Sequence, residues 1–273
     1  MSQPGLSIFS WGGLEDQKSV MSNLPDVLCL SANPNLKGFD RPLLKSLSEQ
    51  VTIAQWEYCQ TQDEPSSLEV ALELLHDYLQ QLVSPIHLVG HGTSGLLGLL
   101  YAQHYPERVR SLTLLSVGIY PAQDWQDRYY SHRQSLPLCR QIILTQMVHD
   151  LFGFQSTAIT QALMKILEQD LDHSLSGHSL FRRMDLLPIR PTVPLLVCGS
   201  VDDVVVNPHH LGSWQQYFRE DSSVSVRLWI CSGGRYFFHY FYPQQTAEQM
   251  LDFWASLPPS TKQPVSEALS VSA

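Results

Sequence analysis

The chain is poor in cationic residues and in long hydrophobic runs. Its 273 residues carry a formal net charge of −9, and no run of lysine or arginine forms a local exception. This balance excludes a general affinity for nucleic acid or anionic membrane surfaces. No apolar run approaches the roughly 20 residues that span a bilayer, and the first residues lack the basic and apolar regions of a signal peptide. We therefore expect a soluble, cytoplasmic protein.

Metal-binding and cofactor-binding patterns are also missing. The five cysteines are scattered without a CxxC pair, which argues against a zinc knuckle or a disulfide framework. No HExxH or HxH spacing occurs, and the stretch GHGTSG lacks the residues that complete a phosphate loop or a dinucleotide fingerprint. The sequence predicts neither a metal site nor a cofactor.

Short apolar runs alternate with segments of helical periodicity. We expect strands at Leu6–Trp11, Asp26–Ser31, Val51–Trp56, Ile86–Gly90, Ser111–Val117, Pro194–Cys198 and Val224–Cys231. Helices are expected between them, at Pro42–Glu49, Ser67–Leu82, Thr93–His104, Pro208–Phe218 and Thr246–Trp254. Such alternation is typical of an α/β fold with a mostly parallel central sheet and helices on both faces.

The alternation stops between Tyr120 and Leu187. This stretch has no strand candidate, and helices are expected at Arg140–Phe152, Thr157–Asp170 and Ser174–Leu186. A helical insertion between two strands of a parallel sheet is typical of a cap. The last residues are polar, rich in proline and serine, and read as a disordered tail. The predicted organisation is a core in two parts (1–119 and 189–257), a helical cap (120–188) and a tail (258–273).

Three blocks of sequence carry a family resemblance. HLVGHGTSGLLGLLYAQHYPERVRSLTLLSVG resembles the strand, nucleophile elbow and helix of the α/β-hydrolase fold, PLLVCGSVDDVVVNPHH its acid-bearing turn, and VRLWICSGGRYFFHYFYPQQTAEQMLDFW its histidine loop and final helix. They occur in the family's order, with the insertion where caps belong. The chain also resembles a group of uncharacterised hydrolase-like proteins of photosynthetic bacteria. The resemblance implies the fold without fixing the activity.

The nucleophile position does not fit an active serine hydrolase. The family pattern G-x-S-x-G falls on Gly90 to Ser94, which puts Gly92 where the serine belongs. Glycine tolerates the strained backbone of this turn without a side chain to react. Thr93 should open the following helix, and Ser94 lies one step inside it. Neither hydroxyl is aimed at the pocket by the usual geometry, so we expect an elbow kept for its shape.

The remaining machinery is altered as well. Asp202 stands at the usual acid position, where it either orients a histidine or caps a turn. Counting from the neighbouring glycines and from Pro243 places Arg235 or Tyr236 at the histidine position, and these side chains either hold an anion or carbonyl oxygen or fill the vacated site. The nearest histidine is His239, three residues late, which a rearranged loop would have to bring inward.

The oxyanion loop departs from the family too. Ser31 and Ala32 stand at the usual His-Gly positions, and Pro34 supplies no N–H. The joint changes favour a non-catalytic module with a degraded triad, similar in kind to the N-myc downstream-regulated proteins. The alternative is an active hydrolase on an ester-like or small carbonyl substrate, with Asp202 and His239 as non-standard machinery. Expected ligands are a small apolar or carbonyl molecule under the cap, near Gly92, Thr93, Ser94, Arg235 and Tyr236, and a protein partner on the aromatic surface around YFFHYFY.

Overall fold

A seven-stranded sheet forms the centre of the molecule. The computed structural model describes residues 6–9, 25–60, 67–120, 124–135, 138–175, 192–218 and 224–259. The strand order is β1-β3-β2-β4-β5-β6-β7, with β1 (Leu6–Phe9) antiparallel to β3 and the other neighbours parallel. The other strands are β2 (Val27–Ser31), β3 (Ile53–Glu57), β4 (Ile86–His91), β5 (Val109–Leu115), β6 (Leu195–Ser200) and β7 (Val226–Cys231). The predicted α/β architecture is confirmed.

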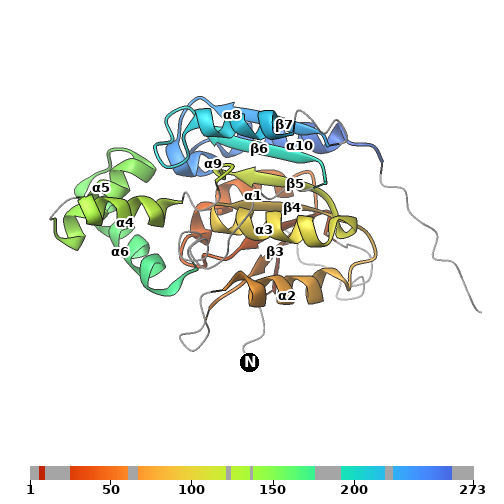
Figure 1. The fold of residues 1–273 in the computed structure, drawn as a ribbon, viewed down its shortest axis with the longest axis horizontal. Coiled ribbons are helices and arrows are strands. Elements are labelled where there is room, and N and C mark those ends of the chain that lie inside the picture. The colour runs from red at the N-terminus through yellow and green to blue at the C-terminus, as the bar shows by residue number, and fades with distance from the viewer. Residues whose placement is uncertain are drawn as a thin grey trace, which may run out of the picture.

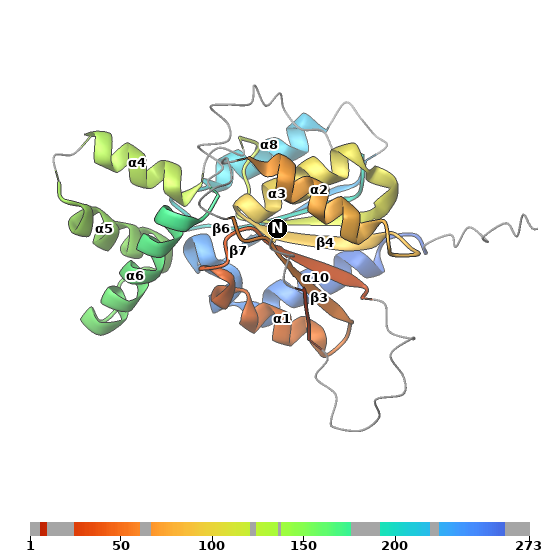
Figure 2. The ribbon, with the colours of Figure 1, turned by 90° about the horizontal axis from the view of Figure 1, so that it is seen from below.

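Helices cover both faces of the sheet (Figures 1 and 2). One face carries α2 (Leu68–Leu79), α3 (Thr93–His104) and α8 (Pro208–Tyr217), and the other carries α1 (Arg41–Ser48) and α10 (Pro243–Ala255). Each face has its own apolar cluster, one including residues of α2, α3 and α8 and the other residues of α1 and α10. Short helical segments complete the core, at η1 (Lys37–Phe39), η2 (Pro106–Arg108), η3 (Arg235–Phe237) and α9 (Phe238–Phe241). Strands β2 to β6 are buried from both sides, which explains their nearly continuous apolar sequences.

Local sequence accounts for most element boundaries. Helix α2 buries Leu68, Ala71, Leu75 and Leu79 at helical spacing, and the Ser67 side chain caps it by accepting a hydrogen bond from the Glu69 amide. Helix α10 begins three residues earlier than expected, because Pro243 occupies its first turn, where proline is favoured. Strand β5 begins two residues earlier and ends two residues earlier than predicted. These shifts do not move any candidate site residue out of its expected loop.

Three helices of the expected cap lie together at one end of the sheet, next to α9 (Figure 1). Helix α5 (Arg140–Phe152) has the predicted bounds, and α6 (Thr157–His173) runs three residues further than predicted. Helix α4 (Trp125–Ser135) was not predicted, because it buries only three residues and shows no marked apolar stripe. In the predicted helix Ser174–Leu186, Ser174 and Leu175 are not helical, and the rest lies outside the described residues. Most of the predicted tail also lies outside them.

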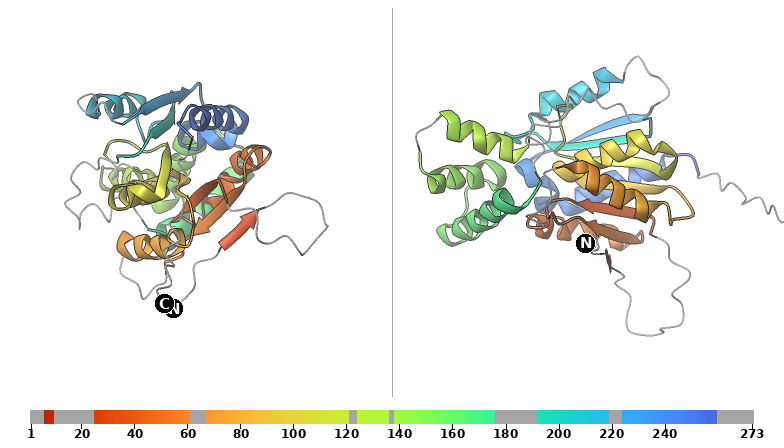
Figure 3. Two further views of the ribbon diagram at one scale, coloured as in Figure 1. Left: turned by 90° about the vertical axis from the view of Figure 1, so that its right-hand side faces the viewer. Right: turned by 60° about the horizontal axis from the view of Figure 1, so that its bottom comes forward.

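The described residues contain neither a membrane-spanning helix nor a cluster of metal ligands. No helix among them has the length and apolar character needed to cross a membrane. Within the same residues, no group of three or more histidine, cysteine or acidic side chains is placed to hold a metal ion. Two further views show the end of the sheet and the cap from other directions (Figure 3).

Candidate functional site

Gly92 retains the backbone of a nucleophile elbow. Strand β4 ends at His91, helix α3 begins at Thr93, and Gly92 between them has φ +52° and ψ −123°. This conformation is strained for residues with a side chain and accessible to glycine. The elbow packs tightly, since a Cβ at Gly90 would lie 2.6 Å from backbone atoms of Ser94 and Gly95. Thr93 opens the helix as expected, so the turn has the strand–turn–helix shape with a glycine at its apex.

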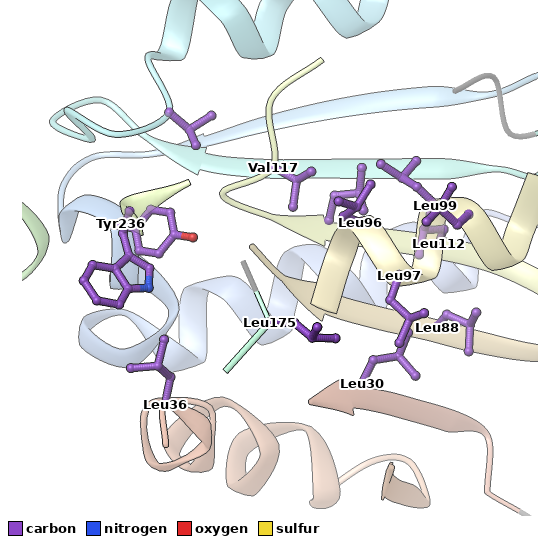
Figure 4. Close-up of a cluster of buried hydrophobic side chains, with 14 of the residues drawn as sticks. Leu30, Leu36, Leu88, Leu96, Leu97, Leu99, Leu112, Val117, Leu175 and Tyr236 are labelled. Atoms are coloured by element: carbon purple, nitrogen blue, oxygen red, sulfur yellow. The ribbon is translucent and has the colours of Figure 1, made fainter. Parts of the chain in front are cut away.

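Tyr236 occupies the space above this turn. A Cβ built on Gly92 would lie 2.4 Å from the Tyr236 hydroxyl oxygen, well inside van der Waals contact, and 3.5 Å from Cζ of the same ring. The ring is only 1% exposed, and Figure 4 shows its hydroxyl pointing into the buried cluster. Burial, followed by the nearby Asp124, Asp203 and Asp170, raises the pKa of Tyr236 well above its usual value. The phenol therefore stays neutral, and it fills the place that a nucleophilic side chain would take.

The oxyanion region is used for internal contacts. The amide of Ala32, at the end of β2, donates a hydrogen bond to Ser94 Oγ at 2.9 Å. Both residues are buried. The Ser94 hydroxyl thus ties helix α3 to the loop after β2, and Ser94 also lines the cavity above Gly92. Thr93, at the start of α3, is also buried, with an amide at the end of the helix where N–H groups lack intrahelical partners.

Asp202 binds the backbone of the histidine loop. Its Oδ1 accepts hydrogen bonds from Ser200 Oγ at 2.6 Å and from the Arg235 amide at 2.9 Å. Partial burial raises the pKa of Asp202, but these hydrogen bonds and the Arg235 guanidinium outweigh it, so the pKa is lowered overall. Asp202 is therefore a carboxylate that holds the loop in place, and it has no histidine partner among the described residues.

Arg235 points away from the elbow, toward the cap. Its φ of +55° is unusual for a residue with a side chain, and its guanidinium donates to the carbonyl of Asp150 at 3.4 Å. Asp150 lies in the last turn of α5, where a cation is favoured by the helix dipole. A Cβ at Gly153, the residue that ends α5, would lie 3.5 Å from Arg235 Nε. Arg235 consequently joins the histidine loop to the cap.

His239 is paired with an acid other than Asp202. It is fully buried, and its Nε2 lies 3.0 Å from Asp40 Oδ1, at the start of α1. The structure therefore does not bring Asp202 and His239 together, because each is engaged by a different partner. The His239 ring lies 4.7 Å from that of His91, whose Nε2 is 3.0 Å from the Tyr236 carbonyl oxygen. Since a carbonyl only accepts, Nε2 of His91 carries a hydrogen.

His91 is a neutral side chain in this arrangement. Burial lowers its pKa well below the usual value, and the nearby His239 lowers it further, while the hydrogen bond to the Tyr236 carbonyl acts in the opposite direction. The His91 ring packs against the rings of Tyr236 and Phe237, with centroids 4.5 and 4.9 Å away. The Asp40–His239 pair was missed, since Asp40 carries no signal beyond its position before a helix.

A buried carboxylate in the cap binds the oxyanion loop. Asp170 of α6 is fully buried and accepts hydrogen bonds from Asn33 Nδ2 at 3.3 Å, Trp125 Nε1 at 3.2 Å and Gln126 Nε2 at 3.2 Å. Asn33 also donates to the Leu175 carbonyl. Burial raises the pKa of Asp170 to about 6, although its hydrogen bonds lower it. We call these contacts the cap latch, because they join α4, α6 and the loop after β2.

A second buried acid lies beside Asp202. Asp203 is 3% exposed, and its Oδ1 accepts hydrogen bonds from the amides of Val205 and Val206. Burial raises its pKa to about 6, with the two amides lowering it. Its contacts are those of a turn, so Asp203 shapes the loop after β6.

The space left above Gly92 is small. A cavity of about 20 Å³ is lined by Gly92, Thr93, Asp40, His91 and Tyr236, among others. This volume accommodates about one water molecule. Ligand pockets usually measure about 300–1,000 Å³. The space above Gly92 in this structure is therefore much smaller than a usual ligand pocket.

The chain has relatives along most of its length. It is 46% identical over 231 residues to an uncharacterized protein of Synechocystis sp., which covers 85% of this chain and 90% of that one. A Nostoc sp. protein described in the same words is 41% identical over 234 residues, 86% of this chain and 92% of its own. More distantly, a cis-3-alkyl-4-alkyloxetan-2-one decarboxylase of Shewanella oneidensis is 24% identical over 70% of this chain and 71% of its own. No protein-family model matches the chain.

Solved structures agree on the fold. A hydrolase from Oleispira antarctica superposes with a TM-score of 0.64 at 15% sequence identity, over 93% of this chain and 95% of that one. At this identity the likeness concerns the fold, and the activity of the neighbour does not transfer. The chain therefore belongs to the family of the Synechocystis and Nostoc proteins, and its fold is that of the α/β-hydrolases.

Proposed function

We propose that this protein is a non-catalytic member of the α/β-hydrolase fold that acts as a binding module. The observation that carries the proposal is the Tyr236 hydroxyl, which occupies the position of a side chain at Gly92. A serine there would overlap with the phenol. The nucleophile has been lost and its space has been filled, which agrees with the filled-site hypothesis drawn from the sequence.

The other former catalytic positions support the same proposal. Asp202 holds the Arg235 amide, Ser94 holds the Ala32 amide, and Asn33 holds Asp170 of the cap latch. Each of these side chains has a hydrogen-bond partner, and it would have to release that partner in order to react. Breaking a buried hydrogen bond of this kind costs about 1–3 kcal/mol. Catalysis at the elbow would require several such losses at once.

Exposed apolar side chains on the cap favour a protein as the ligand. Phe154 is 89% exposed, and Ile142 and Ile159 are about half exposed. The aromatic stretch after β7 contributes less surface than expected, because Tyr236, Phe237, Phe238 and His239 are buried and only Tyr240 and Phe241 are exposed. A small-molecule ligand under the cap would first have to open the cap latch.

Activity-based labelling tests the non-catalytic assignment. The purified protein is incubated with a fluorophosphonate probe and with p-nitrophenyl acetate and butyrate, beside an active serine esterase as the positive control. We expect no stoichiometric label and no turnover above the buffer rate. We also expect none in Gly92→Ser, because His239 is held by Asp40 and Tyr236 stands over the elbow. Labelling of the wild-type protein at one site per chain would refute the proposal.

One observation favours a second candidate, a hydrolytic enzyme with a relocated base. Asp40 lines the cavity above Gly92 and is held by the fully buried His239. A carboxylate oriented by a histidine is a plausible general base for a water molecule in this cavity. This arrangement replaces the Asp202 and His239 pair expected from the sequence. Ester turnover that Asp40→Asn abolishes and Asp202→Asn leaves intact would establish this second function.

A further inference from the structure

A second and larger cavity lies among the described residues at the opposite end of the sheet from Gly92. It has a volume of about 490 Å³ and is lined by residues that open the parallel strands, including Asp26, His87 and Arg110, and by Asp252 and Trp254 of α10. His87 is the second residue of β4, so the elbow lies five residues further along the strand, roughly 16 Å away at about 3.3 Å per residue. This cavity is therefore separate from the site above Gly92.

The wall of this cavity contains two polar groups without partners. Trp254 is 6% exposed, and its indole Nε1 is buried with no hydrogen-bond partner. Arg110 Nε is likewise buried without a partner, and among the described residues no ion pair joins the Arg110 guanidinium to Asp26 or Asp252. Since neither of these two atoms is accessible, a ligand in the cavity would instead meet the accessible part of the half-buried Arg110 side chain.

The neighbouring aromatic rings fix the floor of the cavity. His87 stacks on Trp254 with ring centroids 5.0 Å apart, and its Nδ1 lies 2.7 Å from Ser111 Oγ. Burial, helped by Arg110, lowers the pKa of His87 to about 3, so this ring is uncharged near neutral pH. Arg110 is then the cationic group of the cavity. Val51 and Leu251 add apolar surface to the wall.

The charges of the cavity select the ligand. Arg110 supplies one positive charge, and Asp26 and Asp252 supply two negative charges. Asp26 Oδ2 already accepts the Thr52 amide, whereas the Asp252 carboxylate has no hydrogen bond or ion pair with another described residue. A simple anion would be repelled by the carboxylates, and a simple cation would be repelled by Arg110. A molecule with both charges complements the wall.

We propose that this cavity binds a small zwitterion, an amino acid or dipeptide with apolar side chains. Its carboxylate pairs with the Arg110 guanidinium, its ammonium group pairs with Asp252, and its side chains contact Val51, Leu251 and Trp254. The planar guanidinium of arginine suits a carboxylate. This binding site does not depend on the proposed loss of catalysis, because it uses none of the residues around Gly92.

Isothermal titration calorimetry tests the site with two defined probes, L-leucine and L-leucyl-L-leucine. We expect saturable binding of at least one probe to the wild-type protein, and a Kd raised at least about tenfold in Arg110→Met and in Asp252→Asn. Arg108→Met, two residues away and outside the cavity wall, is the matched control and should bind as the wild type does. Far-ultraviolet circular dichroism of each variant confirms that it is folded.

Blocked forms of the bound probe then test its two charges. The N-acetyl form lacks the ammonium group, and the C-terminal amide lacks the carboxylate, so each should bind at least about tenfold more weakly. No binding of either free probe at concentrations up to about 10 mM would overturn the proposal. So would equal binding of the blocked forms, or binding that folded Arg110→Met leaves unchanged.

Discussion

The contact between Tyr236 and Gly92 makes a quantitative prediction for a double-mutant cycle. Gly92→Ala places a Cβ 2.4 Å from the Tyr236 hydroxyl oxygen in a backbone with φ +52°. We expect a backbone strain of about 1–3 kcal/mol and an overpacking cost of about 1–3 kcal/mol. Because alanine leaves the unfolded chain fewer conformations than glycine does, the substitution also adds about 0.4–1 kcal/mol of stability. The net expected loss of unfolding free energy is about 1–6 kcal/mol.

Removing the Tyr236 hydroxyl oxygen should relieve the overpacking cost. In Tyr236→Phe the next ring atom, Cζ, is 3.5 Å from the new Cβ, which is an ordinary contact. Gly92→Ala should then cost only the strain, so the two substitutions should couple favourably by about 1–3 kcal/mol. Urea unfolding of the four proteins, followed by circular dichroism, measures this coupling.

A matched glycine tests whether the coupling is specific. A Cβ at Gly98 would lie 2.9 Å from Leu112 Cδ1, and Tyr236 is not among the atoms that it would meet. Gly98→Ala should therefore cost the same in the wild-type and Tyr236→Phe backgrounds. Equal costs of Gly92→Ala in both backgrounds, within about 0.5 kcal/mol, would refute the placement of the phenol above the elbow and remove the main support for the proposed function.

Three further predictions concern buried polar groups. The folded-state pKa of Asp170, about 6, lies above the usual value of 3.8 for an aspartate, so the folded protein binds the proton more tightly than the unfolded chain does. As the pH falls from 6 to 4, the unfolding free energy of the wild-type protein should rise by up to about 3 kcal/mol relative to that of Asp170→Asn. Urea unfolding at several pH values measures this difference. The pH dependence expected for His87 has the opposite sign, because its folded-state pKa of about 3 lies below the usual 6.5. Below pH 6.5 the unfolding free energy of the wild-type protein should therefore fall by about 1.4 kcal/mol per pH unit relative to that of His87→Gln. A constant difference across either range would contradict the respective burial argument. Asn33→Ala removes the hydrogen bonds to Asp170 and Leu175. It should speed amide hydrogen exchange in α4 and α6 and leave exchange in α2 unchanged. Unchanged exchange in α4 and α6 would show that the cap latch does not hold these helices.

The fold and the elbow were predictable because their signals are local. Strand β4, the turn at Gly92 and helix α3 follow each other in the sequence, and the turn needs glycines at fixed positions where the helix approaches the strand. Helix α4 was not predictable in this way, because its buried residues are few and its polar residues are many. Its position depends on contacts with α5 and with Asp170.

The histidine loop shows why the site could be predicted only in part. Counting along the chain left Arg235 and Tyr236 as alternatives for the position of the family's histidine. The structure separates them, since the left-handed backbone of Arg235 sends its guanidinium to α5 while Tyr236 turns inward over Gly92. The partners of His239 and Asn33 lie 199 and 137 residues away in the sequence. No local pattern reports contacts at such separations.

Under the proposed function, the glycine at position 92 and the contacts of the cap reinforce each other energetically. A ligand that entered above Gly92 would have to displace the Tyr236 ring, release Arg235 from α5 and separate Asn33 from Asp170, because the cavity there holds about one water molecule. In an active hydrolase, binding and transition-state energy would compensate such costs. Under the proposed non-catalytic function no transition-state energy is available to offset these costs, so nothing opposes the contacts that close the site. Ligand binding is then expected where it leaves these contacts intact, on the outer surface of the cap or in the cavity beside Arg110 and Trp254.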